Sequence, residues 1–365
     1  MGFQNLFYNI YFNKYVKSNK EQIKNIRELK EIPLSILVIS NTALGDTILS
    51  TAALKSLKDS FPNTKITLLV HFKLKKLFEK FPYIDNLVLY YGGYKKFFST
   101  IKEIKKYNPK MSLIFHGNGP QDIQISVLSG CEYILKHPTK SPLKKYLSYD
   151  FKFKLHHTIE DRVEILKSID ARKISKELTY PLSLNETIEN KLDELLKGNK
   201  KIVGYQIGAA DIYKMWPIER FIKLGEKILD YDNDTIIIIT GIDKEYELGE
   251  KIVDSLGSRV LNLCGSCSIE ELPYLLKRMN ILITNDTGTM HLAIAIKTPT
   301  ISLFSTTNSI LSGPYQDFDI HKVIQKDGLD VQKMPKKDRT NENMRLIDVS
   351  DVFNIYVKMQ ASFHV

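Results

Sequence analysis

The sequence predicts an α/β protein built from two consecutive doubly wound modules, each a parallel sheet with helices on both faces. Short, continuously apolar runs alternate with helix-like stretches, first over residues 35–169 and again over residues 202–304. Runs that are apolar throughout, rather than at every second residue, are typical of parallel strands buried on both faces. The 365 residues also exceed what one hydrophobic core commonly supports, which favours two domains.

The first module is predicted to contain five strands. They cover residues 35–40, 66–71, 86–90, 111–116 and 133–136, and helix-like segments cover 47–60, 95–107 and 158–169. Residues 180–186 read as a connection, and the helix after it is expected to end at the glycine stop signal in residues 195–200. We therefore expect a first domain over residues 35–185, preceded by an N-terminal extension over residues 1–34.

The second module repeats the pattern. Its predicted strands cover 202–207, 235–240, 260–263, 281–284 and 300–304, and its helices cover 217–229, 244–256, 269–279 and 289–296. A lysine-rich loop is expected over 325–343 and a terminal helix over 350–359. The second domain should therefore span residues 186–345, with a C-terminal helix in residues 346–365. Ligands in such sheets bind beyond the carboxyl ends of strands, so the expected site is the cleft between the modules.

The charge balance indicates anionic partners. The formal net charge is +10 and the pI is about 9.1, which favours phosphorylated ligands or an acidic membrane surface. The lysines are spread along the chain rather than gathered in one basic block, so we do not expect a nucleic-acid partner.

Cysteine usage and the absence of targeting signals predict a cytoplasmic protein. The cysteines are Cys131, Cys264 and Cys267, an odd number that does not suit a disulfide framework. The pair Cys264 and Cys267 lacks the further ligands of a zinc site, so we interpret it as part of a strand-to-helix turn. No apolar run approaches the roughly 18 residues of a membrane span, and the N-terminus lacks the pattern of a signal peptide.

The N-terminal extension combines aromatic and basic residues. Its aromatic residues recur at roughly helical spacing and are followed by lysines: Phe3, Phe7, Tyr8, Tyr11, Phe12 and Tyr15, then Lys14, Lys17, Lys20 and Lys24. Such a segment suits an amphipathic helix lying on an anionic membrane, which would make the protein peripheral to the membrane. A helix packed on its own domain explains the same pattern, and both interpretations stay open.

The stretch NTALGDTILS, residues 41–50, places Gly45 and Asp46 just beyond the first predicted strand. Asp46 is a candidate helix N-cap, which is the ordinary role of an aspartate at such a position. Its sequence neighbours Thr42 and Leu44 are too small or apolar to neutralise it, and Gly45 lets backbone or ligand approach closely. An unpaired carboxylate facing a cleft can also accept a proton, so Asp46 is the candidate general base.

Two stretches of the second module carry the features of an anion site. Residues 204–217 run from a strand through a loop containing Gly208 to Lys214 and the only tryptophan, Trp216, which we interpret as a packing anchor. A lysine beside a helix N-terminus is well placed to hold a diphosphate, although a solvated loop lysine is the common alternative.

The second of these stretches, residues 281–295, runs from a strand through Asp286 and a Thr-Gly-Thr turn, residues 287–289, into a helix that carries His291. The free N–H groups of that helix would bind anions, with hydroxyl donors from Thr287 and Thr289 and close approach at Gly288. A hydrogen bond to Asp286 is the simpler role for His291.

Taken together, these stretches resemble glycosyltransferase family 9, the bacterial lipopolysaccharide heptosyltransferases. The resemblance runs over about residues 35–310 and rests on Ser35-Ile-Leu-Val-Ile-Ser-Asn-Thr-Ala-Leu-Gly-Asp46, Lys214-Met-Trp-Pro217 and Asn285-Asp-Thr-Gly-Thr-Met-His291. It implies the GT-B architecture, two Rossmann-like domains facing across a cleft with the C-terminal helix crossing back to the first. It also implies inverting, metal-independent transfer from a nucleotide-diphosphate sugar, typically ADP-heptose, to a lipid-linked or oligosaccharide acceptor.

By position, the resemblance makes Asp46 the general base and Lys214 the diphosphate-binding lysine. It makes Asp286, Thr287, Gly288 and His291 the donor motif D-x-G-x-x-H, and Glu245 the acidic residue on the donor ribose, with Glu247 and Glu250 as alternatives. No cofactor or metal is implied.

Departures from the family's pattern leave the donor sugar and acceptor open. Residues 305–308 read Ser-Thr-Thr-Asn in place of Gly-Pro-Thr-Asp, and Gln121 stands where many members have a basic residue. Three alternatives remain: a glycosyltransferase using another nucleotide sugar, a non-hydrolysing sugar-nucleotide epimerase, and a non-catalytic sugar-nucleotide-binding protein in which Asp46 only caps a helix.

Overall fold

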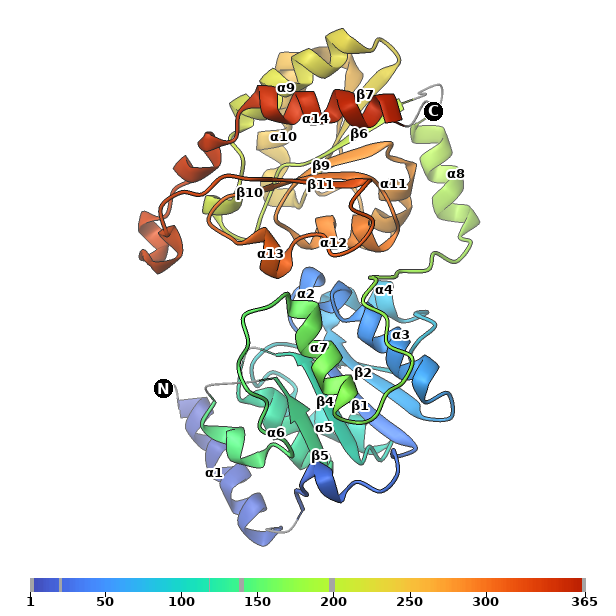
Figure 1. The fold of residues 1–365 in the computed structure, drawn as a ribbon, viewed down its shortest axis with the longest axis vertical. Helices are drawn as coiled ribbons and strands as arrows, with labels where there is room; N and C mark the ends of the chain where they lie inside the picture. The colour runs from blue at the N-terminus through green and yellow to red at the C-terminus, as the bar shows by residue number, and fades with distance from the viewer. Residues whose placement is uncertain (1–2, 20–21, 118, 138–140, 197–200, 363–365) are drawn as a thin grey trace. The chain divides into compact units, whose positions relative to one another are not determined.

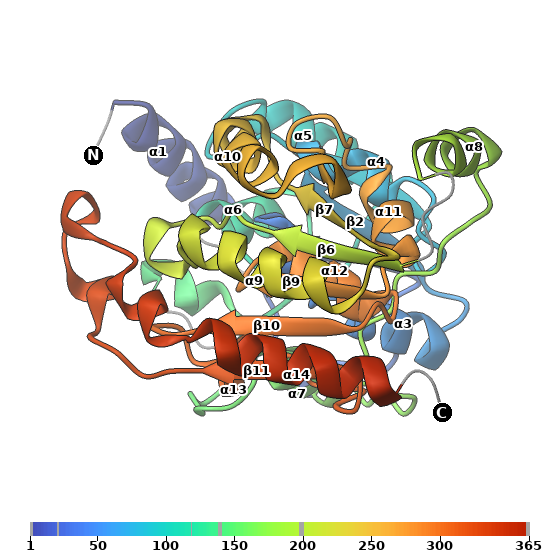
Figure 2. The ribbon, with the colours of Figure 1, turned by 90° about the horizontal axis from the view of Figure 1, so that it is seen from above.

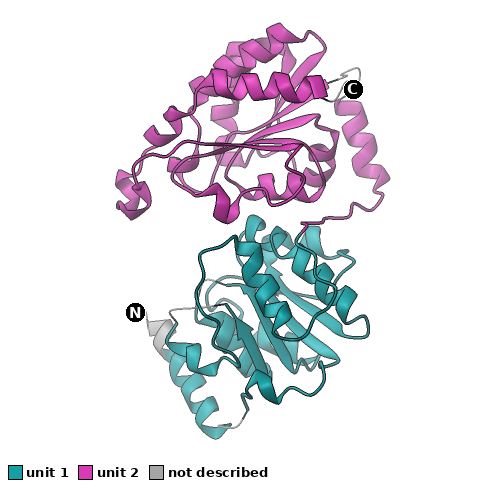
Figure 3. Ribbon diagram, in the orientation of Figure 1, with its two compact units in different colours: residues 1–176 teal, residues 177–365 magenta. Residues whose placement is uncertain are grey.

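A computed structural model of the chain describes residues 3–19, 22–117, 119–137, 141–196 and 201–362. The chain divides into two compact units, residues 1–176 and residues 177–365, which Figure 3 shows in different colours. The division falls earlier in the chain than the boundary after residue 185 that we predicted, and the N-terminal extension belongs to unit 1.

Unit 1 is a parallel five-stranded sheet with helices on both faces (Figure 1). Its strands are β1 (Ser35–Ser40), β2 (Lys65–His71), β3 (Asn86–Tyr90), β4 (Met111–His116) and β5 (Tyr133–Lys136), in the order β3-β2-β1-β4-β5. Its helices are α1 (Phe3–Ser18), α2 (Leu44–Ile48), α3 (Thr51–Ser60), α4 (Lys75–Phe78), α5 (Phe97–Lys105), α6 (Gln121–Leu128) and α7 (Thr158–Lys167). The strand order reverses between β1 and β4, so this is the switch point where ligands of doubly wound sheets bind.

The single helix predicted over 47–60 is two helices, α2 and α3. The first helix does not continue because side-chain donors bind the backbone carbonyl of Asp46. The carbonyl oxygen of Asp46 accepts from the Ser50 hydroxyl at 2.9 Å and from Arg162 at 3.1 Å. The helix also begins earlier than predicted: Ala43 is the N-cap and makes no side-chain cap bond. Asp46 lies in the first turn of α2 and does not cap it, so the capping interpretation is wrong.

Helix α1 packs on its own unit. Phe12 is 1% exposed within the core of unit 1. The ring of Tyr8 stacks on that of Tyr94 with centroids 4.2 Å apart, and Asn9 accepts a hydrogen bond from Gln124. Packing on the parent domain is therefore confirmed, while membrane contact stays a prediction, because other apolar side chains of α1 remain exposed: Phe7, Ile10 and Tyr11.

Unit 2 is a parallel six-stranded sheet, also covered by helices on both faces (Figure 1). Its strands are β6 (Lys201–Gln206), β7 (Thr235–Thr240), β8 (Val260–Asn262), β9 (Ile281–Asn285), β10 (Thr300–Phe304) and β11 (His321–Gln325), in the order β11-β10-β9-β6-β7-β8. Its helices are α8 (Glu186–Leu195), α9 (Ile218–Tyr231), α10 (Tyr246–Leu256), α11 (Leu272–Arg278), α12 (Gly288–Ala295), α13 (Ser309–Ser312) and α14 (Val349–Ser362). The order reverses between β6 and β9.

Two elements of unit 2 differ from the prediction. The edge strand β11 was not predicted, because its polar and partly exposed sequence HKVIQ lacks the continuous apolar run of the inner strands. The glycine stop signal expected after α8 lies outside the described residues.

Helix α14 packs on unit 2, beside α9 (Figure 2). That the C-terminal helix crosses back to the first domain stays a prediction. Its inward side chains Val352, Tyr356 and Met359 belong to the core of unit 2. That core also holds Trp216, which is 1% exposed and donates from Nε1 to the carbonyl of Ile347 at 3.1 Å. The interpretation of Trp216 as a packing anchor is confirmed.

Among the described residues, no helix is both long enough and apolar enough to cross a membrane.

Candidate active-site residues in the two units

The switch point of unit 1 brings Asp46 beside His116. The strands β1 and β4 are paired with Ser40 opposite His116, so the loop after β1 lies against the end of β4. The Thr42 hydroxyl is 2.9 Å from Oδ2 of Asp46 and 2.7 Å from Nδ1 of His116, and Nε2 of His116 is 3.4 Å from Oδ1 of Asp46. The expectation of an unpaired carboxylate is therefore wrong, because one partner comes from a distant strand.

This group of three side chains can share a proton. Burial lowers the pKa of His116, with Arg162 and Lys136 acting in the same direction and Asp46 opposing them. The single hydrogen of Thr42 serves either Asp46 or His116, so with Asp46 as a carboxylate all three contacts have a donor only when the imidazole carries both protons. Asp46 remains 32% exposed, which leaves it accessible as a proton acceptor.

The buried Arg162 fixes the backbone of α2 at Asp46. It projects from α7, is 2% exposed, and donates to the carbonyl of Asp46 at 3.1 Å and to the Ser50 hydroxyl at 3.0 Å. Burial lowers the pKa of its guanidinium to about 10. Thr42, His116 and Arg162 were all missed as site residues. The only sequence signal was that His116 ends a predicted strand, and strand order cannot be read from one sequence.

The switch point of unit 2 holds an ion pair. Lys214 follows β6 and Asp286 follows the neighbouring strand β9, and Nζ of Lys214 is 2.6 Å from Oδ2 of Asp286. The preceding residue, Asn285, accepts from the backbone N–H of Trp216 at 2.9 Å and donates to the carbonyl of Ile207 at 2.8 Å. These hydrogen bonds fix the loop that carries Lys214 to the end of β9.

The predicted anion site lies at the start of α12, one residue earlier than expected. Thr287 is the N-cap and accepts from the N–H of Met290, so the first-turn amides of Gly288 and Thr289 lie at the positive end of the helix. Thr289 and His291 are 8% and 5% exposed. The arrangement provides backbone donors and one lysine, which are the groups that bind a diphosphate.

Glu245 lies over two glycines at the ends of β6 and β7. A Cβ at Gly208 or Gly241 would collide with its carboxylate, which accepts from the N–H of Ile242 at 2.8 Å. Burial raises the pKa of Glu245, and that hydrogen bond opposes the shift. Glu250, one of the alternatives, instead accepts from Asn262 at 2.7 Å. The carboxyl ends of β6, β7 and β9 therefore carry all the predicted donor residues, whereas Gly45 and Asp46 are in unit 1.

Two Rossmann-like units in one chain make this a protein of the GT-B class. The family model described as "Glycosyltransferase family 9 (heptosyltransferase)" matches residues 142–346, more than half of the chain. The chain therefore belongs to glycosyltransferase family 9. The matched range includes the Lys214 and Asp286 stretches and leaves out the Asp46 stretch.

Relatives and solved structures extend the similarity to most of the chain. Lipooligosaccharide heptosyltransferase 2 of Campylobacter jejuni is 28% identical over 317 residues, which cover 84% of this chain and 91% of the relative. A family 9 glycosyl transferase from Veillonella parvula superposes with a TM-score of 0.75 at 21% identity, covering 90% of this chain and 97% of the other. The ADP-heptose lipopolysaccharide heptosyltransferase II of Escherichia coli gives a TM-score of 0.75 at 15% identity, covering 91% and 100%.

Proposed function

We propose that the protein is an inverting heptosyltransferase that moves heptose from ADP-heptose to a lipopolysaccharide-type acceptor. The observation that carries this proposal is the Lys214–Asp286 pair at the switch point of unit 2, beside the start of α12. The family membership supports glycosyl transfer. The names of the C. jejuni and E. coli proteins support heptose as the sugar and ADP as the nucleotide.

In the proposed reaction, an acceptor hydroxyl gives its proton to Asp46 while its oxygen attacks the anomeric carbon of the donor. The bond from that carbon to the diphosphate breaks in the same step, so the configuration is inverted and ADP leaves with the electron pair. Negative charge grows on the diphosphate in the transition state. Lys214 and the first-turn amides of α12 would stabilise this charge more strongly than they stabilise the bound donor. Glu245 binds the ribose hydroxyls, and no metal takes part in transfer.

The acceptor side of the proposal includes a membrane surface. Phe7, Ile10 and Tyr11 of α1 are exposed, and the ring of Tyr11 contacts Phe98, which is also exposed. An exposed aromatic group on a protein of net charge +10 suits the headgroup region of an anionic membrane. We propose that the enzyme works on a lipid-linked acceptor as a peripheral protein at the cytoplasmic face.

The direct test is a donor panel with purified protein. ADP-heptose should give a glycosylated lipooligosaccharide core and free ADP, while UDP- and GDP-sugars should give neither, and NMR of the product should show the inverted anomeric configuration. Transfer from another nucleotide sugar would show that the donor is that sugar rather than ADP-heptose. Isomerised nucleotide sugar formed without acceptor would identify an epimerase, and donor binding without turnover would identify a binding protein.

A further inference from the structure

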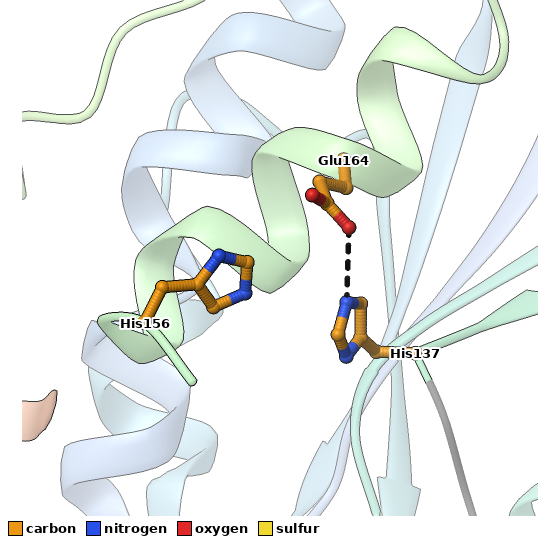
Figure 4. Close-up of side chains that lie close together, drawn as sticks. All are labelled: His137, His156 and Glu164. Carbon is orange, nitrogen blue, oxygen red and sulfur yellow. Dashed lines mark hydrogen bonds and ion pairs between the residues drawn. The ribbon is translucent and has the colours of Figure 1, made fainter. Parts of the chain in front are cut away.

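A second group of titratable side chains lies in unit 1 and does not include Asp46. His137 follows β5, His156 precedes α7, and Glu164 is on α7. One nitrogen from each ring and one oxygen of Glu164 lie within 4.8 Å of one another. Figure 4 shows the two rings and the carboxylate around one space beside α7. Three segments that are separate in the sequence thus converge on two imidazoles and a carboxylate.

The contacts of a fourth residue, Asp161, orient the two rings. Nδ1 of His137 is 2.9 Å from Oδ1 of Asp161, and Nε2 of the same ring is 3.2 Å from Oε2 of Glu164. The same oxygen of Asp161 is 2.6 Å from Nε2 of His156. A carboxylate that accepts from one ring nitrogen while the other faces a second acidic ligand is the arrangement that orients histidines in metal centres.

We propose that His137, His156 and Glu164 bind one divalent transition-metal ion of the Zn²⁺ type, with Asp161 as the orienting carboxylate. Imidazole nitrogens and a carboxylate oxygen are donors that this ion prefers. The charges of Asp161 and Glu164 balance a divalent ion. Lys154 pairs with Oε1 of Glu164 at 2.6 Å, which leaves Oε2 for the ion, and the lysine is 62% exposed and free to move away.

The burial of the three ligands suits a bound ion. The side chains of His137, His156 and Glu164 are 14%, 21% and 22% exposed, so water is largely displaced while a path from solvent remains. Asp161 and Glu164 are spaced three residues apart on α7, and this spacing puts both carboxylates on one helix face. The helix itself therefore keeps the acidic side of the site in place.

The proposed ion has a structural role in unit 1. It would fix α7 to the end of β5 and to the segment before α7. From the same helix, the buried Arg162 donates to the carbonyl of Asp46 at 3.1 Å. Metal binding would therefore help to hold the backbone of the proposed base, and the ion would take no part in the transfer step.

The test is a Zn²⁺ titration by calorimetry of the chelator-treated full-length protein, with wild type compared to His156→Gln, Glu164→Gln and the control His71→Gln. His71 is a partly exposed histidine of the same unit whose ring accepts from the N–H of Lys73. Wild type and the control should bind one Zn²⁺ per chain, and the two ligand variants should bind more than about tenfold more weakly. At a concentration about 100-fold above Kd, Zn²⁺ should raise the Tm of wild type by roughly 5–10 °C.

Co²⁺ binding identifies the ligand type. The Co²⁺ complex should show the visible bands of a tetrahedral ion without the near-ultraviolet charge-transfer band of a sulfur ligand. That sulfur band, an absence of binding in wild type, or equal binding by all four folded proteins would overturn the proposal. Circular dichroism establishes that the variants are folded. None of these outcomes depends on the sugar donor, so the metal site and the proposed transferase activity fail separately.

Discussion

The two units share the same order of their first five strands, with one further edge strand in unit 2, but they place different chemistry at their switch points. In unit 1, between β1 and β4, Asp46 meets a titratable histidine at 3.4 Å, and both side chains are 32% exposed. In unit 2, between β6 and β9, Asp286 meets Lys214 at 2.6 Å, with exposed fractions of 9% and 21%. The first pair is the more exposed and includes an imidazole, whereas the second is less exposed and joins an ammonium group to a carboxylate.

In the proposed reaction, this difference would let one fold, used twice, serve two tasks. A general base needs access to substrate, which Asp46 would have, with His116 beside it as a partner that can gain a proton. A diphosphate site needs donors that are already oriented, and Asn285 would meet this need by fixing the Lys214 loop to the end of β9. We therefore expect changes in unit 1 to affect kcat and changes in unit 2 to affect donor binding.

The largest effect is expected for Asp46→Ala. Loss of the proton acceptor should reduce kcat by about 10²–10⁴-fold and leave the donor Kd unchanged. Steady-state transfer assays with calorimetric donor binding check this. Asp59→Ala is the matched control, because Asp59 is a surface residue of the same unit paired with Lys55, and it should keep normal turnover. Undiminished turnover in Asp46→Ala would remove the role of this residue.

Lys214→Ala should weaken donor binding. Loss of one charge-assisted hydrogen bond to the diphosphate is expected to raise the donor Kd by about 10–100-fold. Lys223→Ala, at an exposed position on α9, should bind donor normally. Equal donor affinity in Lys214→Ala and wild type would show that the lysine serves only its ion pair with Asp286.

His116→Gln should reduce kcat by about tenfold without changing donor Kd, since His116 acts through Asp46 as a positioning residue. Burial lowers the pKa of His116, so the wild-type kcat profile should contain a titration below the usual histidine pKa of about 6.5, and His116→Gln should lose it. A purely structural role would lower activity at every pH alike. An identical pH profile in wild type and His116→Gln would therefore contradict a role for the imidazole proton.

The smallest effect concerns stability in unit 2. His321 is 2% exposed, and burial lowers its pKa to about 4. The unfolded chain has a histidine pKa near 6.5, so it binds more protons than the folded chain between these values, and stability falls as pH falls. This residue should cost about 1 kcal/mol of unfolding free energy between pH 7 and pH 5.5. Urea unfolding of His321→Gln should show a smaller loss of unfolding free energy over this pH range than wild type. Equal losses in the two proteins would contradict the lowered pKa of His321.

The sequence predicted the inner strands well, because continuous apolar runs such as Thr235–Thr240 allow few other structures. It also predicted that Asp46, Lys214 and Asp286 lie beyond the ends of strands, although only Asp286 directly follows one: Asp46 is in the first turn of α2, and Lys214 is in a 3-10 turn after β6. It could not pair Asp46 with His116, because 70 residues separate them and strand order was unknown. The edge strand β11 and the docking of α14 likewise depend on contacts between distant segments, which a local pattern does not record.

The most direct test of the division between the units is ADP binding, measured by calorimetry on Asp46→Asn and Lys214→Ala side by side. We expect a wild-type Kd for Asp46→Asn, because in the proposed reaction unit 2 alone holds the nucleotide, and a clearly higher Kd for Lys214→Ala. A loss of ADP affinity in Asp46→Asn as large as that in Lys214→Ala would contradict this division.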